Sequence, residues 1–135
     1  MDAGDAEPKR LERLGYLRSR RLPGRTHERT HYELTDKGVE ALREWASTRP
    51  DAPRVGADAI LRLLAADLVG ERPVKESLLT MRDELAELRA RLEVADDVAK
   101  TLPHREKYLR LNHRLARRIV DAYDEWLREI DRELD

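Results

Sequence analysis

Apolar residues recur at helical spacing through the second half of the chain. One stripe advances in steps of three and four residues and consists of Leu78, Met81 (or Leu79), Leu85, Leu88, Leu92, Ala95 and Val98. A second stripe has the same steps and consists of Tyr108, Leu111, Leu115, Ile119, Ala122, Trp126 and Ile130, widened by Val120, Tyr123 and Leu127. This period is typical of one face of an amphipathic helix. We therefore predict two long helices, the first from near Pro73 to near Lys100 and the second from about His104 to Leu134.

Shorter elements are predicted in the first half of the chain. A short helix is predicted over Pro8–Leu17, because proline suits a first helical turn and Gly15 marks the exit from the helix. Two strand-like runs, Tyr16–Leu22 and Thr30–Leu34, follow it. The Pro-Gly dipeptide between these runs is a turn signal, so we predict a β-hairpin.

A change of period after the hairpin predicts further helices. Thr35 is a suitable N-cap for a helix that continues to Ala46. The next segment, residues 47–56, contains two prolines and is predicted to be a linker. Another short helix is predicted over Asp58–Leu68, and Gly70 ends it.

The composition narrows the class of protein. The 135 residues include 41% charged residues, no Cys and no Phe, which favours long amphipathic helices over a large compact core. No apolar run is long enough to span a membrane, and the first residues lack the apolar segment of a secretory signal. Without cysteine there is no disulfide framework and no Cys-based zinc site. We therefore expect an intracellular, cytoplasmic protein without membrane association.

The charge is unevenly distributed, although the net charge is only -1. Residues 9–31 contain eight basic and two acidic residues, a balance of 8 − 2 = +6, and the basic ones are Lys9, Arg10, Arg13, Arg18, Arg20, Arg21, Arg25 and Arg29. Much of this charge falls on or beside the predicted hairpin turn, which also contains His27. A basic hairpin can follow a DNA groove and pair its guanidinium groups with phosphates. A charged loop that contacts only solvent is the alternative at this stage.

Three stretches of the sequence resemble the PadR family of transcriptional regulators. They are EPKRLERLGYLRSRR (residues 7–21), ERTHYELTDKGVEALREWA (residues 28–46) and the region 60–134, which is similar to the helical C-terminal domain of the virulence-activator-like subclass. The resemblance implies a mainly α fold with a small β-hairpin. It implies a partial winged helix-turn-helix domain in residues 1–48, a linker in 49–56 and a helical dimerisation domain in 57–135. It also implies a homodimeric regulator that binds double-stranded DNA.

The resemblance further assigns roles to individual residues. The recognition helix would contribute Lys9, Arg10 and Arg13 to DNA binding, and the wing would contribute Arg25, His27 and Arg29. For the helix residues the alternative is plain surface charge, with Arg13 paired to a glutamate of its own helix. The family has two helices ahead of the recognition helix, where this sequence has only MDAGDAE, so we expect the chain to lack them. The alternative function is then a truncated helical dimerisation module without autonomous DNA binding.

Dimerisation and ligand binding complete the expectations. The stripe of the last helix has too few apolar partners within one chain, so we expect a homodimer seam formed by Leu111, Leu115, Ile119, Ala122, Trp126 and Ile130. Some members of the family bind flat aromatic ligands between tryptophans. Trp45 and Trp126 are therefore candidate contacts for a small-molecule effector, with packing in a core or interface as the alternative. No catalytic or metal-binding motif is present, so we expect neither enzymatic activity nor a metal or other cofactor.

Overall fold

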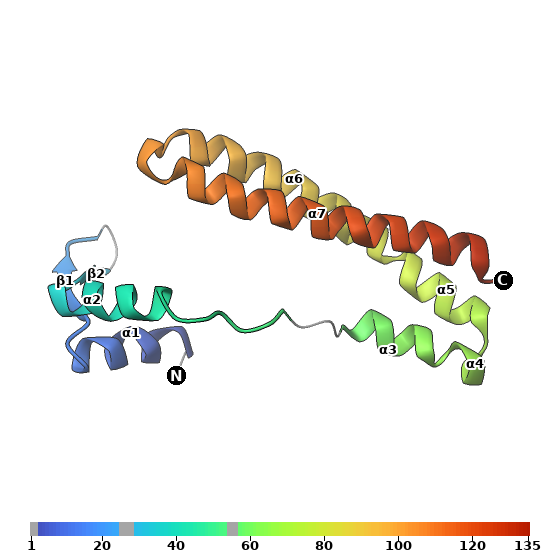
Figure 1. Ribbon diagram of the computed structural model, residues 1–135, viewed down its shortest axis with the longest axis horizontal. Coiled ribbons are helices and arrows are strands. Elements are labelled where there is room, and N and C mark those ends of the chain that lie inside the picture. The colour runs from blue at the N-terminus through green and yellow to red at the C-terminus, as the bar shows by residue number, and fades with distance from the viewer. Residues whose placement is uncertain (1–2, 25–28, 54–56) are drawn as a thin grey trace. The chain divides into compact units, whose positions relative to one another are not determined.

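The computed structural model describes residues 3–24, 29–53 and 57–135, with side chains from residue 6 onward. The chain forms two compact units, unit 1 (Met1–Pro53) and unit 2 (Arg54–Asp135), which are described separately (Figure 1). Unit 1 contains helix α1 (Ala3–Arg13), strands β1 (Leu17–Leu22) and β2 (Arg29–Leu34) and helix α2 (Asp36–Ala46). Unit 2 contains only helices among its described residues, namely α3 (Asp58–Leu64), α4 (Ala66–Val69), α5 (Glu71–Leu79), α6 (Met81–Lys100) and α7 (Pro103–Glu133).

The hairpin predicted from the sequence is confirmed. Strands β1 and β2 pair antiparallel, with Leu17 opposite Leu34 at one end of the ladder and Leu22 opposite Arg29 at the other. The predicted bounds of α1, in contrast, are wrong, because the helix begins at Ala3 and contains Pro8 in its interior. Proline has no N–H group, so α1 lacks one backbone hydrogen bond at this position. Because Pro8 is only partly buried, this loss destabilises the helix less than it would at a buried site.

Helix α1 ends before Leu17 because of Gly15. This glycine has a φ of 83°, the left-handed conformation that commonly ends helices. The N–H groups of Gly15 and Tyr16 turn back to the carbonyl oxygens of Glu12 and Leu11, at 2.9 Å and 3.0 Å. The chain then leaves the helix directly into β1.

A small polar cluster joins α1, β2 and α2. The hydroxyl of Thr35 donates a hydrogen bond to the carbonyl oxygen of Gly15 at 2.6 Å and accepts one from the Gly38 N–H at 3.1 Å. The predicted N-cap is therefore confirmed. Gly38 packs directly on the carbonyl of Tyr16, where a Cβ would lie only 2.1 Å from the oxygen. The Thr-x-x-Gly spacing thus places the capping hydroxyl of Thr35 three residues before a residue without a Cβ, as the contact with Tyr16 requires.

The helices of unit 2 are more segmented than the pattern predicts. The predicted helix over Asp58–Leu68 is divided at Ala65, and the predicted first long helix is divided at Thr80. The Thr80 hydroxyl donates to the carbonyl oxygen of Ser77 at 2.6 Å, and such back-bonding bends helices. The predicted final helix is confirmed as α7, within a residue at each end.

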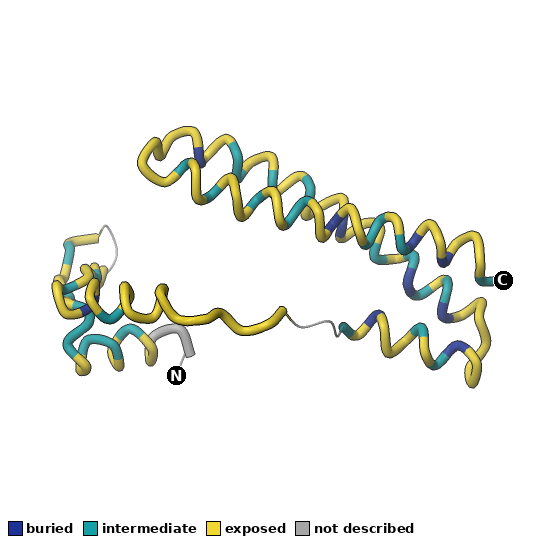
Figure 2. The backbone as a smooth tube through the Cα atoms, viewed as in Figure 1, coloured by how far each residue is buried: buried dark blue, intermediate teal, exposed yellow. Residues whose placement is uncertain are grey.

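The core of the molecule lies in unit 2. Helices α6 and α7 run side by side and antiparallel (Figure 1). Eight buried residues, contributed by α3 through α7, form one cluster: Ala59, Ala66, Val74, Leu78, Leu85, Val120, Leu127 and Ile130. In the described part of unit 1 only Gly38 is buried, and Figure 2 shows most of that unit as exposed or intermediate. None of the helices in the described ranges has the length and apolar character that crossing a membrane requires.

Candidate nucleic-acid interface

The two faces of the hairpin differ in character. In an antiparallel ladder, directly opposed residues point to the same side. Leu17, Ser19 and Tyr32 are partly buried on one face. The Ser19 hydroxyl on this face donates to the Glu12 carboxylate of α1 at 2.6 Å, so this is the face that α1 covers.

The opposite face of the hairpin is exposed and basic. The register places Arg18 opposite Glu33, Arg20 opposite His31 and Leu22 opposite Arg29. Glu33 is the only acid among the described residues of this face, and it lies 3.4 Å from Arg20 and 3.5 Å from His31. Within the described residues, Arg18 and Arg29 form no ion pair. The outward face therefore presents three arginines and a histidine against one carboxylate.

The predicted wing residues are only partly described. Arg29 lies at the start of β2 on the basic face, whereas Arg25 and His27 lie outside the described residues. The prediction omitted Arg18 and Arg20, which share the face of Arg29. The alternation of the strands carries this information, because Leu17 and Tyr32 fix the inner face and leave residues 18 and 20 outside.

Helix α1 adds a smaller basic surface. Lys9 and Arg13 are exposed and lie about one turn apart. Arg10 is engaged with Glu7, with Nη2–Oε1 at 2.6 Å and Nε–Oε2 at 3.2 Å. This contact lowers the pKa of Glu7 and raises that of Arg10, chiefly through the hydrogen bond. The intrahelical pair anticipated for Arg13 thus forms at Arg10 instead.

The predicted dimer seam lies mostly on the exposed side of α7. Leu111, Leu115 and Ile119 are about half exposed or more, and Leu115 reaches 58%. Ile130 differs, because it is only 4% exposed and belongs to the core cluster of its own chain. The apolar stripe of α7 therefore faces away from α6 over its first part and joins the core near its end.

The two tryptophans lie in different units. Trp45, at 72% exposure, lines a hollow at the end of α2. Trp126 lines an apolar hollow of unit 2 with Ile60, Leu63 and Ile119. Its ring also meets Tyr123 edge to face, with centroids 6.2 Å apart. Each tryptophan thus belongs to a separate hollow within its own unit.

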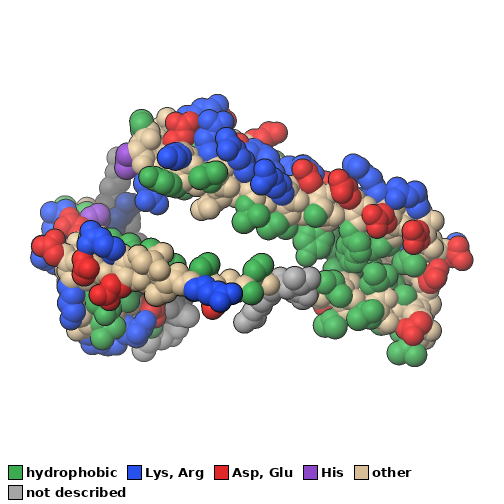
Figure 3. Space-filling view, viewed as in Figure 1, with side chains coloured by type: hydrophobic (Ala, Val, Ile, Leu, Met, Phe, Trp, Pro, Cys, Tyr) green, Lys and Arg blue, Asp and Glu red, His purple; other side chains and the backbone are tan. Residues whose placement is uncertain are grey.

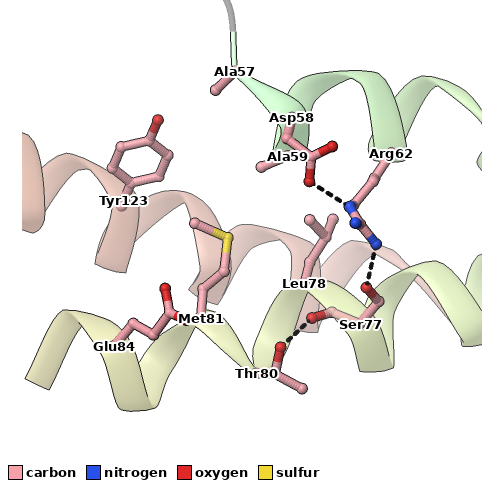
Figure 4. Close-up of a pocket in the computed structure, with 10 residues that line it drawn as sticks. All are labelled: Ala57, Asp58, Ala59, Arg62, Ser77, Leu78, Thr80, Met81, Glu84 and Tyr123. Atoms are coloured by element: carbon pink, nitrogen blue, oxygen red, sulfur yellow. Dashed lines mark hydrogen bonds and ion pairs between the residues drawn. The ribbon is translucent and has the colours of Figure 1, made fainter. Parts of the chain in front are cut away.

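A second hollow of unit 2 lies between α3 and the helices beneath it (Figure 4). Arg62 enters it from α3 and donates hydrogen bonds to Asp58 at 2.5 Å and to the Ser77 hydroxyl at 3.3 Å. The bond to Ser77 joins α3 to α5, and the bond to Asp58 lies within α3. Among the described residues, no group of three His, Cys, Asp or Glu side chains is placed to hold a metal ion.

The two units together have the fold of PadR-like winged-helix regulators, and the resemblance drawn from the sequence is confirmed at the level of the fold. The structure is similar to Bacillus subtilis PadR in complex with operator DNA, with a TM-score of 0.58, 21% identity and coverage of 92% of this chain and 75% of that chain. It is similar to the Vibrio cholerae virulence activator AphA, with a TM-score of 0.69, 20% identity and coverage of 92% and 71%. A PadR-like transcriptional regulator from Bacillus cereus matches with a TM-score of 0.62, 16% identity and coverage of 94% and 75%. No protein-family model and no curated protein matches the chain.

Proposed function

We propose that this chain is a homodimeric, cytoplasmic PadR-like transcriptional regulator that binds double-stranded DNA through the basic face of its hairpin and through α1. The observation that carries this proposal is the segregation of Arg18, Arg20 and Arg29 on the exposed face of the hairpin. One of the similar structures is described as a PadR in complex with operator DNA, which supports the same function for this fold.

The chemistry of the hairpin face suits the DNA backbone. Exposed guanidinium groups form charge-assisted, bidentate hydrogen bonds with phosphate oxygens. Such contacts position a protein on the duplex and carry little sequence information. Lys9 and Arg13 of α1, together with Arg25 and His27 of the wing, would complete the contact surface. Sequence preference would come from α1 as the recognition helix.

Salt-dependent binding to DNA tests the proposal. Binding of the full chain to duplex DNA from upstream of its own gene is measured by fluorescence anisotropy between about 50 and 200 mM salt. We expect the Arg18→Ala/Arg20→Ala variant to bind more weakly. We also expect the magnitude of the slope of log K against log salt to fall by about 4, because the dimer loses two phosphate contacts in each of its two hairpins and each lost contact removes about 0.9.

The matched control removes two arginines elsewhere. Arg91 and Arg105 are exposed residues of unit 2, and the Arg91→Ala/Arg105→Ala variant changes the net charge by the same amount. We expect it to keep the wild-type salt slope. Equal slopes for the hairpin variant and the wild-type protein would contradict the proposed hairpin contacts.

The second candidate is a helical dimerisation module without autonomous DNA binding. The observation that favours it is the exposure of Leu34, Val39, Leu42 and Trp45 in unit 1, since apolar side chains so exposed normally have a partner surface. In this case the chain would form mixed dimers with a longer relative. This candidate would be favoured if the wild-type chain dimerises but does not bind DNA at any of the salt concentrations.

A further inference from the structure

One basic side chain of unit 1 is directed to the protein backbone. Figure 3 shows Lys and Arg side chains on the surface of this unit at the end where α1, the hairpin and α2 meet. Lys37 lies in the first turn of α2 and is exposed, so its position alone would suggest a phosphate contact. Its ammonium group, however, donates a hydrogen bond to the carbonyl oxygen of Leu14 at 2.9 Å. Lys37 therefore joins the start of α2 to the end of α1.

Three consecutive carbonyl groups are bonded to the start of α2 where the chain leaves α1. The oxygen of Leu14 accepts the bond from Lys37. The oxygens of Gly15 and Tyr16 accept bonds from Thr35, the first from its hydroxyl at 2.6 Å and the second from its N–H at 3.1 Å. Carbonyl groups at the end of a helix have no partner within the helix. The start of α2 supplies these partners and so fixes the point at which α1 ends.

The surroundings of the Lys37 ammonium group suit a cation. Its Nζ lies 5.6 Å from the centre of the Tyr16 ring, within the range of a cation–π contact. The side chain also covers Gly15, since a Cβ on this glycine would lie 3.4 Å from Cδ of Lys37. The C-terminal end of a helix carries a partial negative charge, which a nearby cation stabilises. Among the described residues Lys37 forms no ion pair, so its charge acts on the helix end and the ring.

Few other contacts hold α1 within unit 1. The described part of this unit buries no apolar side chain, and the Ser19–Glu12 hydrogen bond joins α1 to β1 only. The placement of α1 on α2 therefore depends on the bonds from Thr35 and Lys37. Thr35 also caps α2 itself, whereas the Lys37 side chain has no part in that cap. Removing the Lys37 ammonium group thus weakens the contact between the two helices and leaves the cap of α2 intact.

We propose that Lys37 is a positioning residue, which fixes α1 on α2 and so presents Lys9 and Arg13 to DNA without binding phosphate itself. This inference rests on the proposed function, in which α1 is the recognition helix. Side chains held near their binding geometry lose less freedom on binding than side chains on an element that moves. Lys37 therefore contributes to DNA affinity through the placement of α1.

Hydrogen exchange of the free protein measures the placement of α1. Lys37→Met keeps a long unbranched side chain and removes the ammonium group. We expect the amides of Leu14, Gly15 and Tyr16, which bond back into α1, to exchange about three- to tenfold faster. The hairpin amides and the α7 amides should exchange as in the wild-type protein. No change at the end of α1, or an equal acceleration of the hairpin amides, would overturn the positioning role.

A double-mutant cycle tests whether Lys37 acts on DNA through α1. Binding to duplex DNA from upstream of the gene is measured by fluorescence anisotropy at about 50 mM salt. Lys37→Met should raise the Kd on the order of three- to thirtyfold, because each protomer of the dimer loses the bond. In a Lys9→Ala/Arg13→Ala background it should raise the Kd by less than about twofold, since α1 no longer supplies the contacts that depend on its placement. Equal factors in the two backgrounds would indicate a direct phosphate contact and overturn the inference.

Two further variants serve as controls. Lys37→Arg keeps a cation that can donate to the Leu14 carbonyl, and we expect it to retain more of the affinity than Lys37→Met does. Arg43 is exposed and pairs with Glu40 within α2, so Arg43→Met removes the same charge from the same helix and should leave the Kd and the exchange rates unchanged. Equal losses for Lys37→Met and either control would overturn the positioning role.

The two measurements separate this inference from the proposed function. Intact DNA binding in Lys37→Met would overturn the inference and leave the proposed function in place. A wild-type chain that does not bind DNA would overturn the proposed function together with the role of Lys37 in DNA affinity. In that case, faster exchange at the end of α1 in Lys37→Met would still support the contact between α1 and α2.

Discussion

Units 1 and 2 are stabilised in different ways. Unit 2 buries eight side chains in one cluster, and Leu78 and Leu127 are almost completely enclosed. The described part of unit 1 buries no apolar side chain, and its elements are joined by the hydrogen bonds of Thr35 and by the close packing of Gly38 on Tyr16. Unit 2 therefore has a stabilising core of its own, whereas the geometry of unit 1 depends on a few polar contacts.

The difference fits the roles proposed for the units. A dimerisation domain needs a rigid support for its exposed stripe, and the core between α5, α6 and α7 provides one. A hairpin that binds along a DNA groove needs exposed charged side chains, and such side chains do not form a hydrophobic core. Unit 1 also leaves apolar residues exposed, among them Val39 and Leu42, and apolar side chains exposed in this way normally have a partner surface.

The largest expected effect is the loss of a core side chain in unit 2. Leu127 is 0% exposed, so Leu127→Ala removes its contacts and leaves a cavity. We expect a loss of about 2–5 kcal/mol in the free energy of unfolding. Urea denaturation followed by far-UV circular dichroism measures it, because most of the helical residues belong to unit 2.

The matched control is a leucine of the same unit whose side chain is exposed to solvent. Leu61 is 69% exposed on α3, and Leu61→Ala should change the free energy of unfolding by less than about 0.5 kcal/mol. Equal losses for the two variants would show that burial within one chain does not determine the stability of unit 2.

The sequence predicts the elements of unit 2 better than their interruptions. The three- and four-residue steps locate α7 within a residue at each end, because a long amphipathic stripe has only one helical register. The interruption at Thr80 depends on a hydroxyl that bonds to the Ser77 carbonyl, and the one at Ala65 has no helix-breaking residue at all. Neither break alters the spacing of the apolar residues, so the periodicity does not reveal them.

The next effect tests the polar contacts of unit 1. Thr35→Ala removes the oxygen that caps α2 and the donor to Gly15, and we expect a local loss of about 1 kcal/mol. Thr35→Ser keeps the hydroxyl and should retain most of the stability. Hydrogen exchange of the Gly38 amide and of the hairpin amides measures the effect, with the α7 amides as the internal reference.

A leucine of unit 1 makes this comparison sharper. Leu42 is half exposed on α2, and we expect Leu42→Ala to affect exchange in unit 1 less than Thr35→Ala does. The opposite ranking would mean that an apolar contact outside unit 1, such as one in the dimer, stabilises this unit more than its own hydrogen bonds.

The candidate site could be predicted in part from the sequence. The excess of arginine between residues 9 and 31 identifies the basic region directly, whereas the grouping of Arg18, Arg20 and Arg29 on one face depends on the strand register. That register could have been derived from the alternation of Leu17 and Tyr32. The Glu7–Arg10 pair was missed because the predicted helix begins at Pro8 and leaves Glu7 outside, whereas α1 begins at Ala3 and places the two side chains three residues apart on one helix face.

The smallest expected effect concerns the ion pairs between the helices of unit 2. Hydrogen bonds from Arg117 and then His113 lower the pKa of Asp96, and those from Lys75 and then Arg82 lower the pKa of Asp131, both below the usual 3.8. A carboxyl whose pKa is lower in the folded state stabilises the fold fully above its unfolded pKa. This contribution is lost as the pH falls below about 3.8, through the lower pKa of the folded state. Because Asp131 is exposed and Asp96 is only partly buried, we expect a modest loss, measured as a fall of the urea midpoint between about pH 5 and pH 2. Asp96→Asn/Asp131→Asn should reduce this fall, whereas an unchanged pH dependence in the double variant would show that these pairs do not contribute to the stability of unit 2.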